Sequence, residues 1–324
     1  MNQAAPAAAL AAANAVPYVG NGTYCYANAA AMLLASHGEP TPPSMLEVLS
    51  GVGLGAAYRK EAGVMFFSDP NGLPDGGIAR AMEILGFAFE TWSGEGRDAA
   101  PFDRLASALE GGPVMIGPLD MGHLRYHPQW EWLGGADHFV LVTAIGDHQV
   151  RIHDPDGLPC VTLPFDELEL AWRAERIAYR SNPFQAWHAP RRVESPSDAQ
   201  IRERAMHWFR QRMEGAPRSG EVSGMNWGAN AIRACAADLR AGTAAPQLHG
   251  FLVFFALKLG ARRALDYANF FDPIDGSLAA AKREQADAFG LAHCAALRKE
   301  WAKLDELLEQ LARIETRIRD RLLA

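Results

Sequence analysis

Apolar residues in the first half of the chain occur in short runs that glycine and proline interrupt. A helical period predicts helices in this half over residues 26–36, 78–85 and 102–109. Runs rich in β-branched and aromatic residues predict strands over residues 114–116, 139–145 and 149–153. Because the helical patterns come first and the strands follow, we expect an α+β fold with an antiparallel sheet.

The pattern changes near residue 190. Residues 190–196 are polar and carry two prolines, which predicts a linker, and Ser197 or Asp198 after them suits a helix N-cap. Beyond this point the chain is predicted to be helical almost throughout. Near its end, apolar residues recur every three or four positions, at Leu304, Leu307, Leu308, Leu311, Ile314 and Ile318. This stripe predicts a core-facing helix of a bundle, and a homodimer seam formed by the C-terminal helices is the alternative.

These patterns divide the chain into three predicted parts. Residues 1–16 are rich in alanine but lack a positively charged start and a long apolar core, so we expect a mobile tail and no signal peptide. Residues 17–190 form the predicted α+β domain, and residues 197–324 form a helical domain. The apolar stretch 251–259 is interrupted by Lys258 and is too short to cross a bilayer, so no membrane association is expected.

Composition excludes several classes of function. The 324 residues are 49% hydrophobic and 21% charged, with a net charge of −7 and no basic stripe. Nucleic acid is therefore not expected as a partner. The four cysteines form no CxxC pair, which indicates neither a zinc site nor a disulfide framework. We expect no metal, reduced thiols and a cytoplasmic location.

One of these cysteines occupies a position suited to chemistry. A glycine-containing loop, residues 20–24, runs into an Ala- and Leu-rich helical pattern that stops at Gly38, a residue type common just after a helix. Cys25 therefore lies at or next to a predicted helix N-terminus, where the N–H groups and the helix dipole favour a thiolate. Many cysteines at such positions are inert, so a nucleophile also needs a base.

Residues 137–155 predict a β-hairpin with a short turn that carries a glycine and an aspartate. His138 begins the first strand and Asp154 ends the second, so the two residues lie side by side at the open end. A two-residue loop would point these side chains to opposite faces. A three-residue loop, or a bulge of equal parity, points them to the same face.

The apolar pattern of the hairpin selects the second arrangement. It pairs residue 140 with 154, residue 142 with 152 and residue 144 with 150. One face then carries apolar residues, namely Val140, Val142, Ala144, Val150 and Ile152. The same register that buries this face brings His138 and Asp154 together. Cys25, His138 and Asp154 thus have the roles of a catalytic triad: a nucleophile, a general base and a carboxylate that orients the base.

The motifs resemble a known family. His-Phe-Val-Leu-Val at residues 138–142 and Val-Arg-Ile-His-Asp-Pro-Asp at 150–156 resemble the His/Asp hairpin of C39-type papain-like peptidases. Within that group, the likeness is closer to the butirosin biosynthesis protein H N-terminal-domain family. It includes the early cysteine before an Ala/Leu helix, the Gly-rich stretch 50–55 and the strand and loop at 113–120. The likeness covers about residues 17–190, and the helical remainder resembles the C-terminal domain that often accompanies the family.

This resemblance implies a papain-like catalytic domain that performs acyl transfer in secondary-metabolite biosynthesis. The type member is similar to a transferase that takes an acyl group from the phosphopantetheine thioester of an acyl carrier protein. Cys25 matches the nucleophile, His138 the base and Asp154 the orienting residue. The implied partners are an acyl carrier protein and a small-molecule acceptor, with an amine, hydroxyl or water accepting the acyl group. The chain itself needs no cofactor, because the partner carries the acyl donor.

One departure from the family pattern concerns the oxyanion hole. Papain-like peptidases usually carry a glutamine a few residues before the nucleophile, and residues 19–24 contain none. Asn21 is a candidate substitute, with the Cys25 backbone N–H as the second donor. A turn-forming role for Asn21 is an equal alternative. Because a thioester is already activated, it needs less help from an oxyanion hole than a peptide bond does.

Other residues are candidates for substrate binding. Tyr24 precedes the nucleophile, and the loop after the strand at 114–116 carries Asp120, His123 and Tyr126, which can contact a polar acceptor. A purely structural loop is the alternative.

Two further functions remain open for the whole chain: a C39-like cysteine peptidase or hydrolase, including a thioesterase, and a non-catalytic binding module. The helical domain has three open roles, which are covering the cleft, dimerising the protein or docking a carrier protein.

Overall fold

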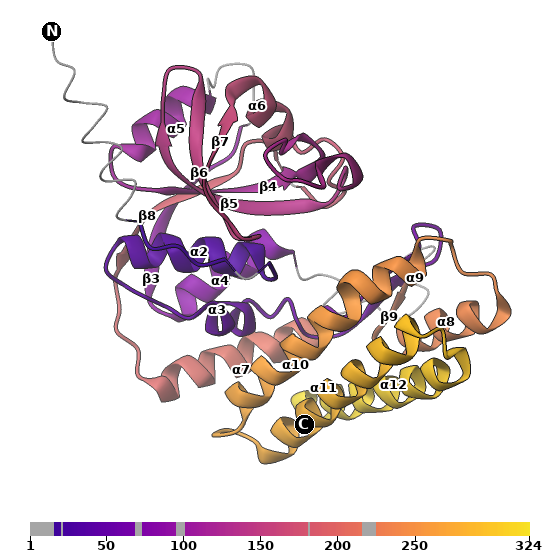
Figure 1. Cartoon of the computed structure of the whole chain (residues 1–324). Coiled ribbons are helices and arrows are strands. Elements are labelled where there is room, and N and C mark those ends of the chain that lie inside the picture. The colour runs from indigo at the N-terminus through magenta and orange to yellow at the C-terminus, as the bar shows by residue number, and fades with distance from the viewer. Residues whose placement is uncertain (1–15, 21, 69–72, 95–100, 181, 216–224) are drawn as a thin grey trace, which may run out of the picture. The chain divides into compact units, whose positions relative to one another are not determined.

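The computed structural model describes residues 16–20, 22–68, 73–94, 101–180, 182–215 and 225–324 (Figure 1). The chain forms two compact units. Unit 1 contains residues 1–46 and 85–195, and unit 2 contains residues 47–84 and 196–324. Apart from Val16, the predicted N-terminal tail lies outside the described residues.

Unit 1 is built on a six-stranded antiparallel sheet, which confirms the predicted α+β class with an antiparallel sheet. In spatial order its strands are β3 (Phe87–Trp92), β8 (Ala186–Arg192), β4 (Val114–Asp120), β5 (Asp137–Ile145), β6 (Gln149–Asp154) and β7 (Leu158–Pro164). The helices are α2 (Cys25–Ser36), α5 (Pro101–Leu109) and α6 (Phe165–Arg173), with the short helices η1 (Met121–His123) and η2 (Trp130–Trp132) between β4 and β5.

Helices cover the two faces of this sheet differently. On one face, α5 and α6 cover an apolar core that includes Val140, Val142, Val150 and Ile152. Helix α2 packs against β5 and β4, and the ring of Tyr26 meets the edge of Phe139 at 6.0 Å between centroids. Because side chains alternate along β5, Phe139 points away from the face that carries Val140. Helix α2 therefore covers the opposite face from α5 and α6 (Figure 1).

The β5–β6 hairpin has the predicted parity. Leu141 pairs with His153, and Val142 pairs with Ile152, so residues 140 and 154 face each other as expected. The register shifts by one residue between Val142 and Ala144, which is a β-bulge. The expected pairing of Ala144 with Val150 is wrong, because the bulge pairs Ile145 with Val150 instead. The bulge also lets Ile145 take the place of Ala144 against the apolar core.

Unit 2 is mostly helical, with one small antiparallel sheet. The sheet has the order β2 (Val64–Phe66), β1 (Ala57–Arg59) and β9 (Met225–Trp227). Its helices are α4 (Pro74–Ile84), α7 (Asp198–Glu214), α8 (Gly228–Ala241), α9 (Leu248–Phe251), α10 (Leu257–Phe271), α11 (Gly276–Leu297) and α12 (Trp301–Leu323). A π-helical turn, η3 (Leu252–Ala256), joins α9 to α10. Helix α3 (Pro43–Ser50) spans the sequence boundary between the two units.

The predicted domain boundary differs from the observed division of the chain. We expected residues 47–84 to belong to the α+β domain, but they form part of unit 2. The physical reason is that β1 pairs with β9, so backbone hydrogen bonds connect residues 57–59 to residues 225–227. The predicted linker also begins later than expected, because β8 continues to Arg192. Helix α7 begins as predicted, with Ser197 and Gln200 forming a capping box.

The C-terminal apolar stripe faces the interior of unit 2. Helix α12 packs against α8 and α11, and every residue of the stripe is at most 3% exposed. This confirms the prediction of a core-facing helix. These side chains are therefore unavailable as a seam between two copies, and a homodimer would have to use other surfaces. None of the helices in the described part of the chain is both long and apolar enough to cross a membrane.

Candidate functional site

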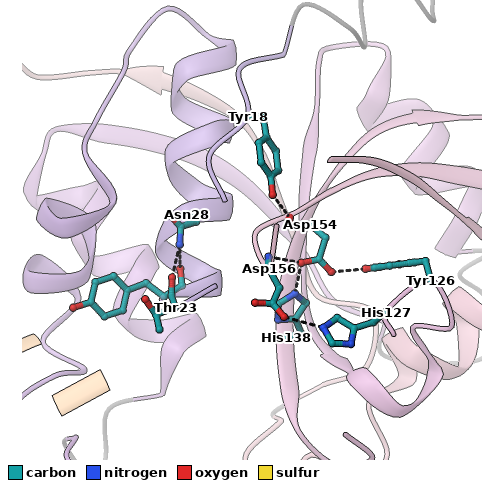
Figure 2. A network of polar contacts seen from close by, with 9 residues as sticks. Tyr18, Thr23, Asn28, Tyr126, His127, His138, Asp154 and Asp156 are labelled. Carbon is teal, nitrogen blue, oxygen red and sulfur yellow. Dashed lines mark hydrogen bonds and ion pairs between the residues drawn. The ribbon is translucent and has the colours of Figure 1, made fainter. Parts of the chain in front are cut away.

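Cys25 is the first residue of α2, as the sequence predicted. The residue before it, Tyr24, has left-handed backbone angles (φ 61°, ψ 47°) that turn the chain sharply into the helix. Asn28, which is fully buried, donates from its side-chain amide to the carbonyl oxygens of Thr23 and Tyr24 (Figure 2). These bonds fix the junction between loop and helix and leave the Cys25 side chain half-buried at the helix start.

His138 and Asp154 form a buried pair at the open end of the β5–β6 hairpin. His138 Nε2 lies 2.7 Å from Asp154 Oδ1. The Asp154 carboxylate also accepts hydrogen bonds from the Asp156 backbone N–H at Oδ1 and from the Tyr126 hydroxyl at Oδ2, each at 2.7 Å (Figure 2). Three donors therefore fix the orientation of this carboxylate, which in turn orients the imidazole.

Electrostatics favour a charged pair. Burial by itself lowers the pKa of His138, but the Asp154 carboxylate and a hydrogen bond with the Cys25 thiol raise it well above its ordinary value. Burial raises the pKa of Asp154, but the charge and hydrogen bond of His138 lower the pKa by more than burial raises it. The net pKa of Asp154 is therefore below its ordinary value. Because Nε2 of His138 contacts Asp154, the other ring nitrogen, Nδ1, is the one available to Cys25. The structure thus brings all three predicted residues together.

Two contacts hold the loop before Cys25 against the loop after β6. The Tyr18 hydroxyl donates to the Asp154 carbonyl oxygen at 2.8 Å, and the Gly22 N–H donates to the Pro155 carbonyl oxygen at 3.0 Å. Gly22 has φ +75°, and a Cβ there would lie 2.9 Å from Asp156 Oδ1. Glycine is therefore required at position 22 for both conformation and space. This connection sets the position of the cysteine relative to the His–Asp pair.

The other predicted site residues have different environments. Tyr24 is 4% exposed and offers little surface to a ligand. The Asp120 carboxylate accepts bonds from the Gly122 and Gly135 N–H groups and from the Arg176 guanidinium, so it anchors the loop between β4 and β5. Its expected contact with substrate is not supported by this geometry. His123 is half-buried, and Asn21 lies outside the described residues.

Tyr126, a predicted substrate-binding residue, donates a hydrogen bond from its hydroxyl to Asp154. The structure therefore gives it a contact with the His–Asp pair. A second pair, which the sequence pattern does not predict, lies next to it: His127 Nε2 is 2.8 Å from Asp156 Oδ2, and His127 Nδ1 accepts from the Gln129 N–H. The sequence signal available for this pair was an acidic residue two positions after Asp154. Among the described residues, no cluster of three or more His, Cys, Asp and Glu side chains is arranged to hold a metal ion.

The His138–Asp154 pair is expected to stabilise the fold most between about pH 4 and pH 6.5. The pKa of His138 is raised on folding, so its contribution is complete below 6.5 and is lost as the pH rises through the folded-state pKa. The pKa of Asp154 is lowered, so its contribution is present above 3.8 and is lost as the pH falls through the folded-state value. Denaturant unfolding of the wild type and Asp154→Asn, from well below this range to well above it, checks the prediction. A stability difference that does not vary with pH would contradict it.

The fold and geometry together define a class: an α+β protein that joins a helix-start cysteine to a buried His–Asp pair and also carries a helical unit. The family model of the YobF C-terminal domain matches residues 221–323. Over 306 residues, the chain is 37% identical to the "Uncharacterized protein YobF" of Bacillus subtilis (strain 168), covering 94% of this chain and 98% of that protein. The chain therefore belongs to the YobF family.

Proposed function

We propose that the protein is a papain-like cysteine acyltransferase that uses the thioester of an acyl carrier protein as its donor. The observation that carries the proposal is the contact of Cys25, at the start of α2, with a His138 that Asp154 orients at 2.7 Å. A raised His138 pKa keeps the imidazole protonated near neutral pH, and an imidazolium beside the thiol favours the nucleophilic thiolate. The resemblance of residues 17–190 to the butirosin biosynthesis protein H N-terminal-domain family supports the same chemistry.

The proposed reaction has two steps. In the first, Cys25 Sγ attacks the thioester carbonyl carbon, and the bond from this carbon to the pantetheine sulfur breaks. The leaving thiolate takes its proton from His138. In the second, an amine, hydroxyl or water attacks the acyl carbon while His138 removes a proton from it, and the Cys25 thiolate leaves. Asp154 stays ionised throughout and stabilises the imidazolium form of His138.

Negative charge on the tetrahedral intermediate needs donors near Cys25. The backbone N–H of Cys25 lies at the N-terminus of α2, where the helix dipole favours an anion. Asn21 remains the proposed second donor. A thioester carbonyl is more reactive than an amide carbonyl, so a site without the glutamine of papain-like peptidases suits a thioester better.

The remaining proposals follow from this chemistry. The donor requires phosphopantetheine on a carrier-protein partner, the acceptor is a small molecule, and the chain itself supplies no cofactor. The four cysteines, Cys25, Cys160, Cys235 and Cys294, are all free thiols in the structure. Free thiols are typical of a reducing compartment, so we place the reaction in the cytoplasm, within secondary-metabolite biosynthesis.

Intact-protein mass spectrometry after incubation with an acyl-pantetheine thioester tests the proposal. The wild type is expected to gain one acyl mass, and Cys25→Ala to gain none. Cys160→Ala and Cys294→Ala remove exposed thiols and serve as controls that retain the adduct. Failure of the wild type to form an adduct, or an equal adduct on Cys25→Ala, would rule the proposal out.

A cysteine peptidase is the second candidate, because the same three residues can attack a peptide bond. Cleavage of a peptide that is lost in Cys25→Ala, without any thioester adduct, would favour it. A non-catalytic binding module is the third. That function predicts that iodoacetamide alkylates Cys25 no faster than an ordinary free thiol.

Tyr126 is expected to act as a positioning residue for this reaction. In Tyr126→Phe, the buried Asp154 carboxylate loses one of its three donors. We expect kcat to fall roughly 10- to 150-fold, the equivalent of one lost hydrogen bond to a charged group, while KM changes little. The pH profile of kcat should also shift. Loss of the Tyr126 hydrogen bond changes the pKa of Asp154 and, through the ion pair, that of His138. A change in KM alone would indicate that Tyr126 contacts substrate instead.

Tyr58→Phe is the matched control. The Tyr58 hydroxyl also donates to a carboxylate, Asp238 Oδ2 at 3.0 Å, but it belongs to unit 2. The Tyr58→Phe variant should have altered stability and an unchanged pH profile of kcat.

A further inference from the structure

In the described part of unit 2, a cluster of four charged side chains lies buried in the helical core. They come from four different helices: Glu47 from α3, Arg263 from α10, Lys282 from α11 and Glu315 from α12, and each is less than 7% exposed. Figure 1 shows α10, α11 and α12 lying side by side, and they also pack together. Burying charges is costly, and apolar residues of similar volume usually serve stability at least as well. The cluster therefore calls for an explanation other than stability.

Two of these four charged side chains, Arg263 and Lys282, line a cavity. Its interior volume is about 10 Å³, room for about one water-sized group, and it opens to solvent; its walls include Gly53, Gly55, Arg263, Lys282, Gln285 and Phe289. The described residues that line it contribute two cations and an amide but no carboxylate. Glu47 and Glu315 do not line the cavity. Each accepts a hydrogen bond from a residue that does, Arg263 and Gln285 respectively. An anion that enters the cavity therefore meets positive charge first.

Lys282 has donors to spare within this cavity. Among the described residues, its ammonium donates one hydrogen bond, to Gln285 Oε1 at 2.9 Å, and lies 5.1 Å from the centre of the Tyr267 ring. An ammonium carries three N–H donors. Within the described part of the chain no carboxylate lies within ion-pair distance of Lys282, because Gln285 stands between it and Glu315, donating to Glu315 Oε2 at 3.1 Å. A nearly buried ammonium with one neutral acceptor is a costly arrangement unless a ligand completes it.

Arg263 supplies the second positive charge. Its Nε donates to Glu47 Oε1 at 2.7 Å and its Nη1 donates to the Phe67 carbonyl oxygen at 3.3 Å. These bonds fix the guanidinium at the cavity wall. Gly53 makes this close packing possible, because a Cβ there would lie 2.8 Å from the Tyr267 ring and 3.0 Å from Arg263 Cδ.

We propose that this cavity in unit 2 binds a small oxyanion, a carboxylate or phosphate group, between Lys282 and Arg263. Such a group has several acceptor atoms, which match the ammonium, the guanidinium and the Gln285 amide. At this volume one oxygen atom of such a group fits inside, and the rest of the group lies at the opening to solvent. This binding site is independent of the Cys25 chemistry, and its presence or absence leaves the proposed function untouched.

Protonation of Lys282 connects the site to pH. Burial lowers the Lys282 pKa to about 8, with Glu315 on α12 opposing that shift and Arg263 on α10 adding to it. The Tyr267 ring also faces the ammonium from α10. Because only the ammonium form attracts an anion, affinity should weaken as the pH rises through this value.

Isothermal titration of the full chain with acetate and with phosphate, at constant ionic strength set by sodium chloride, tests the proposal. We expect saturable binding in the millimolar range or tighter and a rise in unfolding temperature with anion concentration. Lys282→Met should weaken binding about 10- to 100-fold, because a charge-assisted hydrogen bond is lost. Lys258→Met, at an exposed position of α10, is the matched control and should leave binding unchanged. Binding of acetate alone identifies a carboxylate ligand, and binding of phosphate alone identifies a phosphate.

The wild type provides a second measurement if Lys282→Met does not fold. Its oxyanion affinity should fall at least about tenfold between about pH 7 and about pH 9.5, as Lys282 loses its proton. The absence of saturable binding by either anion, or binding that depends on neither pH nor Lys282, would overturn the proposal.

Discussion

Replacement of His138 by alanine is expected to lower the rate of acyl-enzyme formation roughly 10²- to 10⁴-fold, the usual contribution of a general acid–base residue. The imidazole is buried, contacts Cys25 and is held by Asp154 at 2.7 Å. Without it, Cys25 loses the cation that favours its thiolate, and the pantetheine sulfur loses its proton donor. Single-turnover kinetics with an acyl-pantetheine thioester would measure the loss.

His148→Ala is the control for this variant. His148 belongs to the turn of the same hairpin, and its side chain is exposed. Its removal should leave the rate within a factor of about two, since surface substitutions rarely matter energetically. Equal losses in the two variants would mean that disruption of the hairpin, and not the loss of a base, explains the effect.

The second large effect concerns stability. Glu47→Ala should destabilise unit 2 by about 3–5 kcal/mol, because breaking a buried ion pair leaves an uncompensated charge. Glu47 is fully buried, and its Oε1 accepts the hydrogen bond of Arg263 Nε at 2.7 Å. Denaturant unfolding of the full chain would detect the loss as an earlier transition of unit 2. The double variant Glu47→Leu/Arg263→Met should recover much of the stability, since it removes both charges.

An exposed ion pair in the same unit provides the comparison. Arg233 and Glu309 contact each other at 3.0 Å, but both side chains are more than 40% exposed. Glu309→Ala should therefore cost at most about 1 kcal/mol. If Glu47→Ala cost no more than Glu309→Ala, the buried pair would have little energetic importance.

Local patterns predicted much of what positions the candidate site. The apolar alternation in β5 and β6 required an odd register shift, and a bulge between Val142 and Ala144 supplies it. A bulge within a strand and one extra residue in the turn have the same effect on which side chains share a face. The apolar pattern therefore could not show which of the two supplies the shift. Strands β3, β7 and β8 were not predicted. Strand β7 is mostly exposed and β8 contains Pro190, so neither of these two carries a strong strand pattern.

The division of the chain was not predictable in the same way. Strand β1 has only three residues, and its pairing with β9 joins segments more than 160 residues apart. Nothing local to either strand indicates that pairing. The roles of Asp120 and Tyr126 were also beyond the sequence, because a polar loop residue has the same appearance whether it contacts a ligand or another side chain.

The sequence by itself determined that Cys25 begins a helix, that His138 and Asp154 share one face of a hairpin, and that α12 buries its apolar stripe. Each of these follows from periodicity and turn chemistry within a few neighbouring residues. The tertiary structure alone decided that Cys25 meets His138, that Tyr126 supports Asp154, and that Lys282 and Arg263 line one cavity. These contacts join residues far apart in the chain, and only the packing of whole elements, which balances apolar burial against chain entropy, selects them.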